Sequence, residues 1–174
     1  MLAEQVMTAD VRVCAPNDDL AKVAGLMWDY DCGCVPVVDA SERVVGMITD
    51  RDACMAAYTK GRPLAELIVS DAMASNVITC KRSDTTHSIE QLMADNQIRR
   101  IPVVDDDGRI AGIVSLNDLA RASARPPSRG GQVDQRHVAL TLAATAAPRS
   151  SFPPPNGSAS TSRSSDSKSE GASA

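Results

Sequence analysis

Residues 35–52 read VPVVDASERVVGMITDRD, and residues 101–118 read IPVVDDDGRIAGIVSLND. Both stretches share a Pro-Val-Val-Asp run, a glycine seven residues after its aspartate, and an aspartate at the end. Shifting the sequence by 66 residues extends the match without a gap over residues 7–56 and 73–122, with 15 of 50 positions identical. Agreement over that length shows that the chain contains an internal duplication.

Each copy predicts the same order of secondary structure, β-α-β-β-α, from its apolar periodicity and its turn and capping residues. The predicted strands are residues 11–13, 35–38 and 44–48 in the first copy, and 77–79, 101–104 and 110–114 in the second. The predicted helices follow Asn17-Asp18 and begin near Asp50 in the first copy, and follow Ser83-Asp84 and begin near Leu116 in the second. The predicted fold class is therefore α/β, more narrowly α+β, with two tandem β-α-β-β-α repeats.

One copy of about 50 residues buries too little surface to be stable alone. We therefore expect the copies to pack with pseudo-twofold symmetry, to share one core, and to leave two equivalent clefts where a small ligand can bind. The predicted boundaries are residues 7–58 and 73–124 for the two copies, 59–72 for the linker, 125–149 for a second linker with a short helix, and 150–174 for a tail.

The C-terminal part differs in composition from the duplicated part. Residues 150–174 are rich in serine, contain three consecutive prolines, and have Phe152 as their only large apolar residue. Such a segment cannot offset the entropy lost on ordering, so we expect it to be disordered. Residues 133–147 place Val138, Leu142 and Ala146 on one helical face, which predicts a short helix packed on the body or on a partner.

Charge and composition exclude several classes of protein. Residues 1–124 carry 12 basic and 19 acidic residues, which argues against nucleic-acid binding. No apolar stretch is long enough to span a membrane, and the N-terminus has no basic segment followed by an apolar core, so we expect a cytoplasmic protein. The five cysteines are an odd number in a chain without a visible secretory signal, which predicts reduced thiols and not a disulfide framework.

The repeated Gly-x-x-(Thr/Ser)-x-x-Asp segment is the strongest candidate for chemistry. It comprises Gly46, Thr49 and Asp52 in the first copy, and Gly112, Ser115 and Asp118 in the second. The hydroxyl ends a strand and the carboxylate follows one helical turn later, so a phosphate could bind the hydroxyl and the helix N-terminus while the carboxylate accepts hydrogen bonds from a ribose diol. The alternative is a capping box that only closes the helix, and duplication would copy either one.

The repeat resembles the CBS domain, named after cystathionine β-synthase, and two in tandem resemble a CBS pair, or Bateman module. The resemblance rests on the Met-x-x-x-Val opening, the (Val/Ile)-Pro-Val-Val-Asp strand and the Gly-x-x-(Thr/Ser)-x-x-Asp segment, and covers residues 1 to about 124. It implies a regulatory, non-catalytic module that binds AMP, ADP, ATP, S-adenosylmethionine or NAD. It also implies a homodimer formed through the helices, and a separate effector protein.

The resemblance also implies ligand-binding residues. Asp52 and Asp118 would hold ribose hydroxyls, and Thr49 and Ser115 would contact ribose or phosphate. The residues before and at the start of the Pro-Val-Val strands would contact phosphate or adenine; the candidates are Cys34 and Val35 in the first copy, and Arg99, Arg100 and Ile101 in the second.

In related pairs the strand start of one copy often faces the aspartate of the other copy. On that pattern Arg99 and Arg100 join Thr49, Arg51 and Asp52 in a phosphate-binding cleft, whereas Ser115, Asn117, Asp118, Gly33 and Cys34 form a cleft without a comparable cation. A solvated arginine pair at a strand start is the alternative for Arg99 and Arg100.

Other chemistry finds little support in the sequence. The histidines, His87 and His137, lie outside the repeated motifs, no catalytic set or metal site is predicted, and Asp105-Asp106-Asp107-Gly108 is read as a turn. Cys14 and Cys80 are expected to be buried. Two alternatives to ligand sensing stay open: an interaction module with vestigial clefts, and a redox- or metal-responsive protein that uses Cys32 and Cys34.

Overall fold

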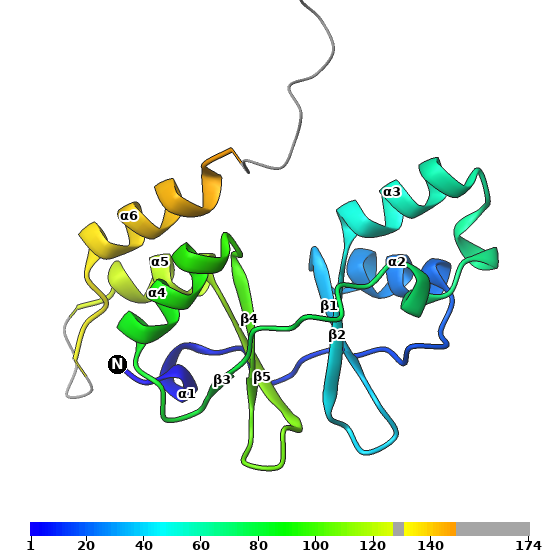
Figure 1. The fold of residues 1–174 in the computed structure, drawn as a ribbon. Coiled ribbons are helices and arrows are strands. Elements are labelled where there is room, and N and C mark those ends of the chain that lie inside the picture. Colours follow the sequence, from blue (N-terminus) through cyan, green and yellow to red (C-terminus); the bar gives the residue numbers. More distant parts are fainter. Residues whose placement is uncertain (127–130, 149–174) are drawn as a thin grey trace, which may run out of the picture.

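The computed structural model describes residues 1–126 and 131–148, and it contains two similar halves followed by a further helix (Figure 1). The first half contains α2 (Leu20–Asp29), β1 (Cys34–Val38), β2 (Val44–Thr49) and α3 (Asp50–Lys60). The second contains β3 (Cys80–Lys81), α4 (Thr86–Asn96), β4 (Arg100–Val104), β5 (Ile110–Ser115) and α5 (Leu116–Ser123). The remaining elements are α1 (Ala3–Val6), the 3-10 helices η1 (Leu64–Glu66) and η2 (Val69–Asp71), and α6 (Gln135–Ala146).

The two predicted hairpins are confirmed. Strand β1 pairs antiparallel with β2, and β4 pairs antiparallel with β5 in the same register. Each turn is closed by the aspartate that ends Pro-Val-Val-Asp: Asp39 Oδ1 accepts the backbone N–H groups of Ser41 and Arg43, and Asp105 Oδ1 accepts the equivalent pair. The repeated aspartate is therefore a turn residue, because it satisfies backbone donors that the turn leaves unpaired.

The first predicted strand is absent from the first copy and begins later than predicted in the second. Residues 11–13 and 77–79 are not strands; Cys14 instead makes a single parallel bridge to Val37, and β3 begins at Cys80 and pairs parallel with β4. Alternation of apolar residues could not locate these strands, since only one or two residues of each copy pair with the sheet.

The opening residues of each copy pack on the other copy, which produces the expected pseudo-twofold arrangement. Thr8 bridges Ile113 of β5, and Ala74 bridges Met47 of β2. The preceding methionines lie over the repeated glycines: a Cβ atom on Gly112 would lie 2.6 Å from Met7 Sδ, and one on Gly46 would lie 2.5 Å from Met73 Sδ. The repeated Met and Gly positions are therefore the two sides of a crossed contact between the copies.

The expectation of one shared core is wrong, because the structure has two clusters of buried residues. One surrounds Ile89, Met93 and Ile101 and includes Ala3 from the N-terminal segment. The other surrounds Leu20, Val35 and Ile48 and includes Leu67 and Val69 from the stretch between the copies. Each copy thus completes its own core with a segment that precedes the other copy.

The predicted C-terminal helix is confirmed as α6, which contacts α4 and α5 of the second half (Figure 1). Thr141 is buried in this contact, Val138 packs on the core of the second half, and Val133 is buried just before the helix. Leu142, predicted on the apolar face, is exposed. The tail predicted over residues 150–174 lies outside the described residues.

Candidate functional site

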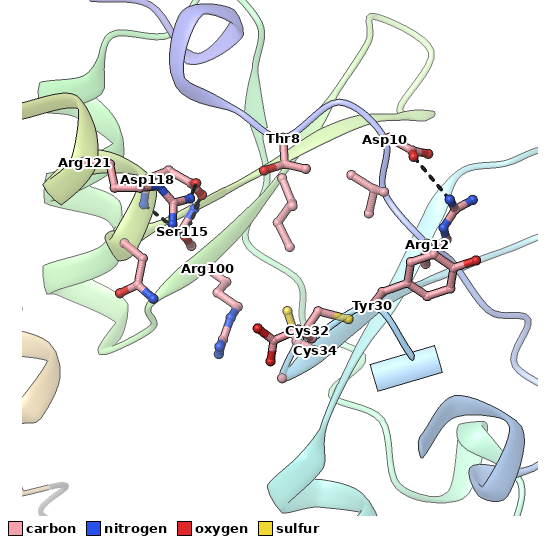
Figure 2. A pocket seen from close by; sticks show the side chains of 15 residues that line it. Thr8, Asp10, Arg12, Tyr30, Cys32, Cys34, Arg100, Ser115, Asp118 and Arg121 are labelled. Atoms are coloured by element: carbon pink, nitrogen blue, oxygen red, sulfur yellow. Dashed lines mark hydrogen bonds and ion pairs between the residues drawn. The ribbon is translucent and has the colours of Figure 1, made fainter. Parts of the chain in front are cut away.

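A cavity of about 330 Å³ lies between the two halves (Figure 2). Its walls come from the N-terminal arm (residues 8–12), from the connection between α2 and β1, and from β4, β5 and α5. The lining residues are Thr8, Asp10, Val11, Arg12, Tyr30, Asp31, Cys32, Gly33, Cys34, Arg100, Ile113, Ser115, Asn117, Asp118 and Arg121. Both copies therefore contribute to this one site.

The Ser115–Asp118 pair forms a closed hydrogen-bonded unit at the start of α5. Asp118 Oδ2 accepts the Ser115 backbone N–H at 2.8 Å and the Ser115 hydroxyl at 2.5 Å, while the Asp118 backbone N–H donates to Ser115 Oγ at 3.2 Å. Arg121, one turn further along the helix, donates to Asp118 Oδ1. Capping is therefore part of the role of this pair, and both oxygens of Asp118 already accept hydrogen bonds.

Three guanidinium groups line the cavity. Arg12 lies over the Tyr30 ring with 4.3 Å between Cζ and the ring centroid, and its Nη2 donates to Asp10 Oδ2 at 3.2 Å. Arg100 extends from β4 toward Gly33, where an added Cβ atom would lie only 3.2 Å from Arg100 Nη2. Arg121 lies on α5 at the opposite wall.

The charges of this cavity are mixed. Asp10, Asp31 and Asp118 line the same space as the three arginines, so the formal charges of the lining balance. Guanidinium groups bind phosphate or carboxylate with paired hydrogen bonds, whereas carboxylates accept hydrogen bonds from hydroxyl groups. The cavity can therefore hold a ligand with an anionic end and a hydroxyl-rich part.

Four predicted site residues meet here: Cys34, Arg100, Ser115 and Asp118. Gly33 and Cys34 lie with Ser115 and Asn117 as expected, but Arg100 lines this cavity and not one on the Asp52 side. The expectation that this cleft lacks a cation is wrong, since Arg12, Arg100 and Arg121 all line it. The error arose because the pattern assigned each strand start to a single cleft, whereas the long side chain of Arg100, the first residue of β4, extends toward Gly33 at the start of the other hairpin.

Thr49 and Asp52 form the matching closed unit at the start of α3. Asp52 Oδ2 accepts the Thr49 hydroxyl at 2.6 Å and its backbone N–H at 3.0 Å. Neither residue lines the cavity, and Arg51 and Arg99 are exposed outside it. The side chains of Val35 and Ile101 lie fully buried in the two core clusters, so they can reach a ligand only through their backbone groups.

The cysteines behave mainly as buried apolar residues. Cys14 and Cys80 are buried as predicted, and burial raises the pKa of each thiol to about 12. Burial also raises the pKa of Cys34 to about 11, although the nearby Arg100 favours its thiolate. Cys34 is therefore a protonated thiol at neutral pH, which does not favour its use in redox or metal chemistry.

Sequence reasoning missed eight lining residues: Thr8, Asp10, Val11, Arg12, Tyr30, Asp31, Ile113 and Arg121. The first four lie on the N-terminal arm, whose crossing to the other copy leaves no local signal in the sequence. Arg121 had a usable signal, because it follows Asp118 by three residues and such residues share a helix face.

The CBS domain family matches residues 3–58 and 69–125, in agreement with the two halves of the fold. This chain belongs to the CBS domain family. CBS domain-containing protein YhcV of Bacillus subtilis is 35% identical over 117 residues, covering 67% of this chain and 81% of YhcV. Uncharacterized protein MK0525 of Methanopyrus kandleri is 32% identical over 115 residues, covering 66% of this chain and 59% of MK0525.

Solved CBS structures share the arrangement. The CBS-domain containing protein ATU1752 from Agrobacterium tumefaciens is 30% identical and superposes with a TM-score of 0.64, covering 70% of this chain and 98% of that protein. The CBS domain pair of protein MJ0100, crystallised with 5-methylthioadenosine and S-adenosyl-L-methionine, is 25% identical with a TM-score of 0.62, covering 70% of this chain and 98% of that chain.

The chain is thus a CBS pair, a regulatory module built from two repeats. Among residues 1–126 and 131–148, no helix has the length and apolar character needed to cross a membrane.

Proposed function

We propose that this CBS pair binds an adenosine-containing ligand, such as AMP, ADP, ATP or S-adenosylmethionine, in the cavity between its halves and signals by a change in their packing. The observation that carries the proposal is the convergence of three arginines and the Ser115–Asp118 unit on one cavity of about 330 Å³. That volume is at the lower end of the range for small-molecule sites. The adenosyl ligands of the MJ0100 pair support the choice of ligand class.

The ligand would divide its groups among the charged side chains of the cavity. Its phosphate or carboxylate would bind Arg100 and Arg12, whose guanidiniums can each form two parallel hydrogen bonds to an anion. Its ribose hydroxyls would bind Asp118 Oδ1, displacing the Arg121 hydrogen bond. The Arg121 side chain is 66% exposed but the Asp118 side chain only 8%, so the ribose hydroxyls would have to replace the hydrogen bond that buried Asp118 Oδ1 loses.

Signalling would follow from the fact that different segments of the chain form the walls of the cavity. A ligand held between the N-terminal arm, the α2–β1 connection and α5 binds one relative packing of these segments better than others, and so shifts the population toward it. Displacement of Arg121 would alter the exposed surface of α5, which also contacts α6. An effector protein that reads this surface is the proposed receiver of the signal.

The second predicted cleft, with Thr49, Arg51, Asp52 and Arg99, stays a proposed second site. Because Asp52 closes its helix as Asp118 does but lies outside the described cavity, it also provides a matched control. Asp52→Ala and Asp118→Ala each remove one capping carboxylate, so we expect similar losses in the free energy of unfolding, about 0.5–2 kcal/mol.

The test is calorimetric titration of the full chain with AMP, ADP, ATP, S-adenosylmethionine and NADH. We expect one ligand of this set to saturate the wild type, and Asp118→Ala and Arg100→Ala to weaken its binding at least tenfold while Asp52→Ala leaves the tighter site unchanged. Circular dichroism and thermal unfolding of each variant show that it is folded.

A folded protein that binds no ligand of the set would overturn the proposal. It would favour a second function, an interaction module with vestigial clefts, for which the hydrogen bonds already made by both oxygens of Asp118 are the supporting observation. Equal loss of binding in Asp52→Ala and Asp118→Ala would place the ligand away from the described cavity.

We also propose a homodimer, formed by the first half. Met27 and Met93, predicted as core or dimer surface, are buried. In contrast, Trp28 on α2 and Tyr58 on α3 are 87% and 81% exposed, and they match Ala94 and Ala124 of the second half. Helix α6 covers part of α4 and α5, so α2 and α3 offer the more apolar surface to a second copy. Sedimentation of wild type and Trp28→Ala tests this arrangement.

A further inference from the structure

Helices α4 and α6 bring together a group of three side chains outside the cavity. His87 and Glu90 lie three residues apart on α4, and His137 lies on α6. The distances from Glu90 Oε2 to His87 Nδ1 and to His137 Nδ1 are both 3.9 Å, and the two imidazole ring centroids are 5.0 Å apart. One ligand atom from each residue falls within 4.8 Å of the others.

Glu90 is a buried carboxylate with one oxygen atom that makes no hydrogen bond in the described part of the chain. Its side chain is only 5% exposed, and its Oε1 has no hydrogen-bond partner among the described residues. Burial raises its pKa, the nearby histidines and the chain N-terminus oppose that rise, and Asp134 adds to it. An unpaired buried carboxylate costs free energy unless a cation or hydrogen-bond donor compensates it.

The two histidines supply the other two possible metal ligands, and their exposure lets an ion reach Glu90. The His87 and His137 side chains are 59% and 44% exposed, so an ion can reach Glu90 from solvent along the imidazole edges. In a tetrahedral zinc site with bonds of about 2.0–2.1 Å, ligand atoms lie roughly 3.3 Å apart. The 3.9 Å distances thus need to shorten by roughly 0.6 Å, and the widest separation, at most 4.8 Å, by at most roughly 1.5 Å. Rotation of the two exposed imidazole side chains can supply these changes.

We propose that His87, Glu90 and His137 form a binding site for a divalent transition-metal ion, best suited to Zn²⁺, with water as the fourth ligand. Two imidazoles and one carboxylate are a ligand set that zinc accepts with an open position. The site is independent of the adenosyl-ligand cavity, because none of its residues lines that cavity.

A bound ion would fasten α6 to α4. The two α4 ligands and the α6 ligand lie on helices already in contact, but α6 buries few apolar side chains in that contact. Binding to the docked state alone stabilises it by mass action. The metal would therefore control whether α6 stays on the second half of the pair.

The test uses the full chain, freed of metal with a chelator and titrated with Zn²⁺ in competition with a chromophoric zinc indicator. We expect one Zn²⁺ per chain, and at least about 100-fold weaker binding in His87→Ala, His137→Ala and Glu90→Gln, since even loss of an outer hydrogen-bond partner costs 10–100-fold. Gln91→Ala, on the same helix, is the control that leaves the three ligands in place.

Two further measurements distinguish this site from other sources of binding. The chain has only two histidines, so imidazole resonances in NMR spectra report on this site alone, and both should shift together with one equivalent of Zn²⁺. A Cys32→Ser/Cys34→Ser variant should bind Zn²⁺ as wild type does. The proposal is overturned if binding survives His137→Ala unchanged, if it disappears in the cysteine variant, or if the histidine resonances do not move.

Discussion

The crossed Met–Gly contacts predict that one substitution, glycine to alanine, has opposite effects at different places in this chain. At Gly112 an added Cβ atom would lie 2.6 Å from Met7 Sδ and 3.0 Å from the Thr8 backbone oxygen. The thioether can rotate away, but the Thr8 oxygen accepts the Ile113 N–H at 2.9 Å, and the Thr8 N–H donates to the Ile113 oxygen at the same distance. The N-terminal arm must therefore shift as a unit.

The magnitudes follow from which atoms can move. Overpacking against backbone gives an expected loss of about 1–3 kcal/mol in the free energy of unfolding for Gly112→Ala. At Gly46 the near atoms are side-chain atoms of Met73 and Val37, so Gly46→Ala should cost less, about 1 kcal/mol. Gly25 lies inside α2 with nothing within 4 Å of its added Cβ, so Gly25→Ala should stabilise by about 0.5–1 kcal/mol.

The assay is urea unfolding followed by circular dichroism, with the slope m checked for constancy. Met7→Ala in the Gly112→Ala background should restore part of the loss, because it removes the closer of the two contacts. The crossed packing would be refuted if the free energy of unfolding of Gly112→Ala lay within about 0.3 kcal/mol of wild type. It would also be refuted if Gly25→Ala were less stable than Gly112→Ala.

Three further predictions concern the turns, the thiols and the exposed aromatic surface. Gly108 has φ of 81° and its equivalent Glu42 has φ of 62°, so Gly108→Ala should lose about 1–2 kcal/mol by thermal unfolding, whereas Glu42→Gly should lose little or gain; a loss at both positions contradicts the strain argument. Cys54 is exposed and should react with iodoacetamide first, while the Cys34 pKa of about 11 means that its alkylation rate rises with pH up to that value; mass spectrometry that finds Cys34 modified first at pH 7.5 contradicts this. Trp28→Ala should change the free energy of unfolding of the monomer by less than about 0.5 kcal/mol yet weaken self-association, and an unfolding loss of several kcal/mol would mean that Trp28 is a core residue.

The duplication made much of the fold predictable. Both hairpins, their Asp39 and Asp105 turns and the helices after Thr49 and Ser115 follow from local patterns, because the residues that close each turn or cap lie within four positions of one another. The single-residue bridge at Cys14 and the division into two cores were not predictable in this way, since both depend on contacts between segments distant in the chain.

In the candidate site, too, residues linked by local spacing were predictable and residues brought together by distant contacts were not. Ser115 and Asp118 were found because their spacing is local and repeated. Arg12 reaches the cavity only because the N-terminal arm crosses to the other copy. His87 and His137 are 50 residues apart and meet only because α6 docks on α4, so nothing in their spacing indicated a shared site. Arg100 lines this cavity because its side chain extends toward Gly33 of the other copy, a contact between distant segments that the sequence does not show.

The crossed arms also affect the order in which the protein can fold during synthesis. Thr8 of the N-terminal arm leaves the ribosome about 105 residues before its pairing partner Ile113. At 5–20 residues per second, the arm waits roughly 5–20 s for its docking surface. The first half in turn completes its core with Leu67 and Val69, and the second half completes its core with Ala3. A cut before Leu67 therefore leaves each fragment without the core residues that lie on the other. Mixing the two fragments would restore both cores. The pair thus folds as one unit despite its repeated sequence.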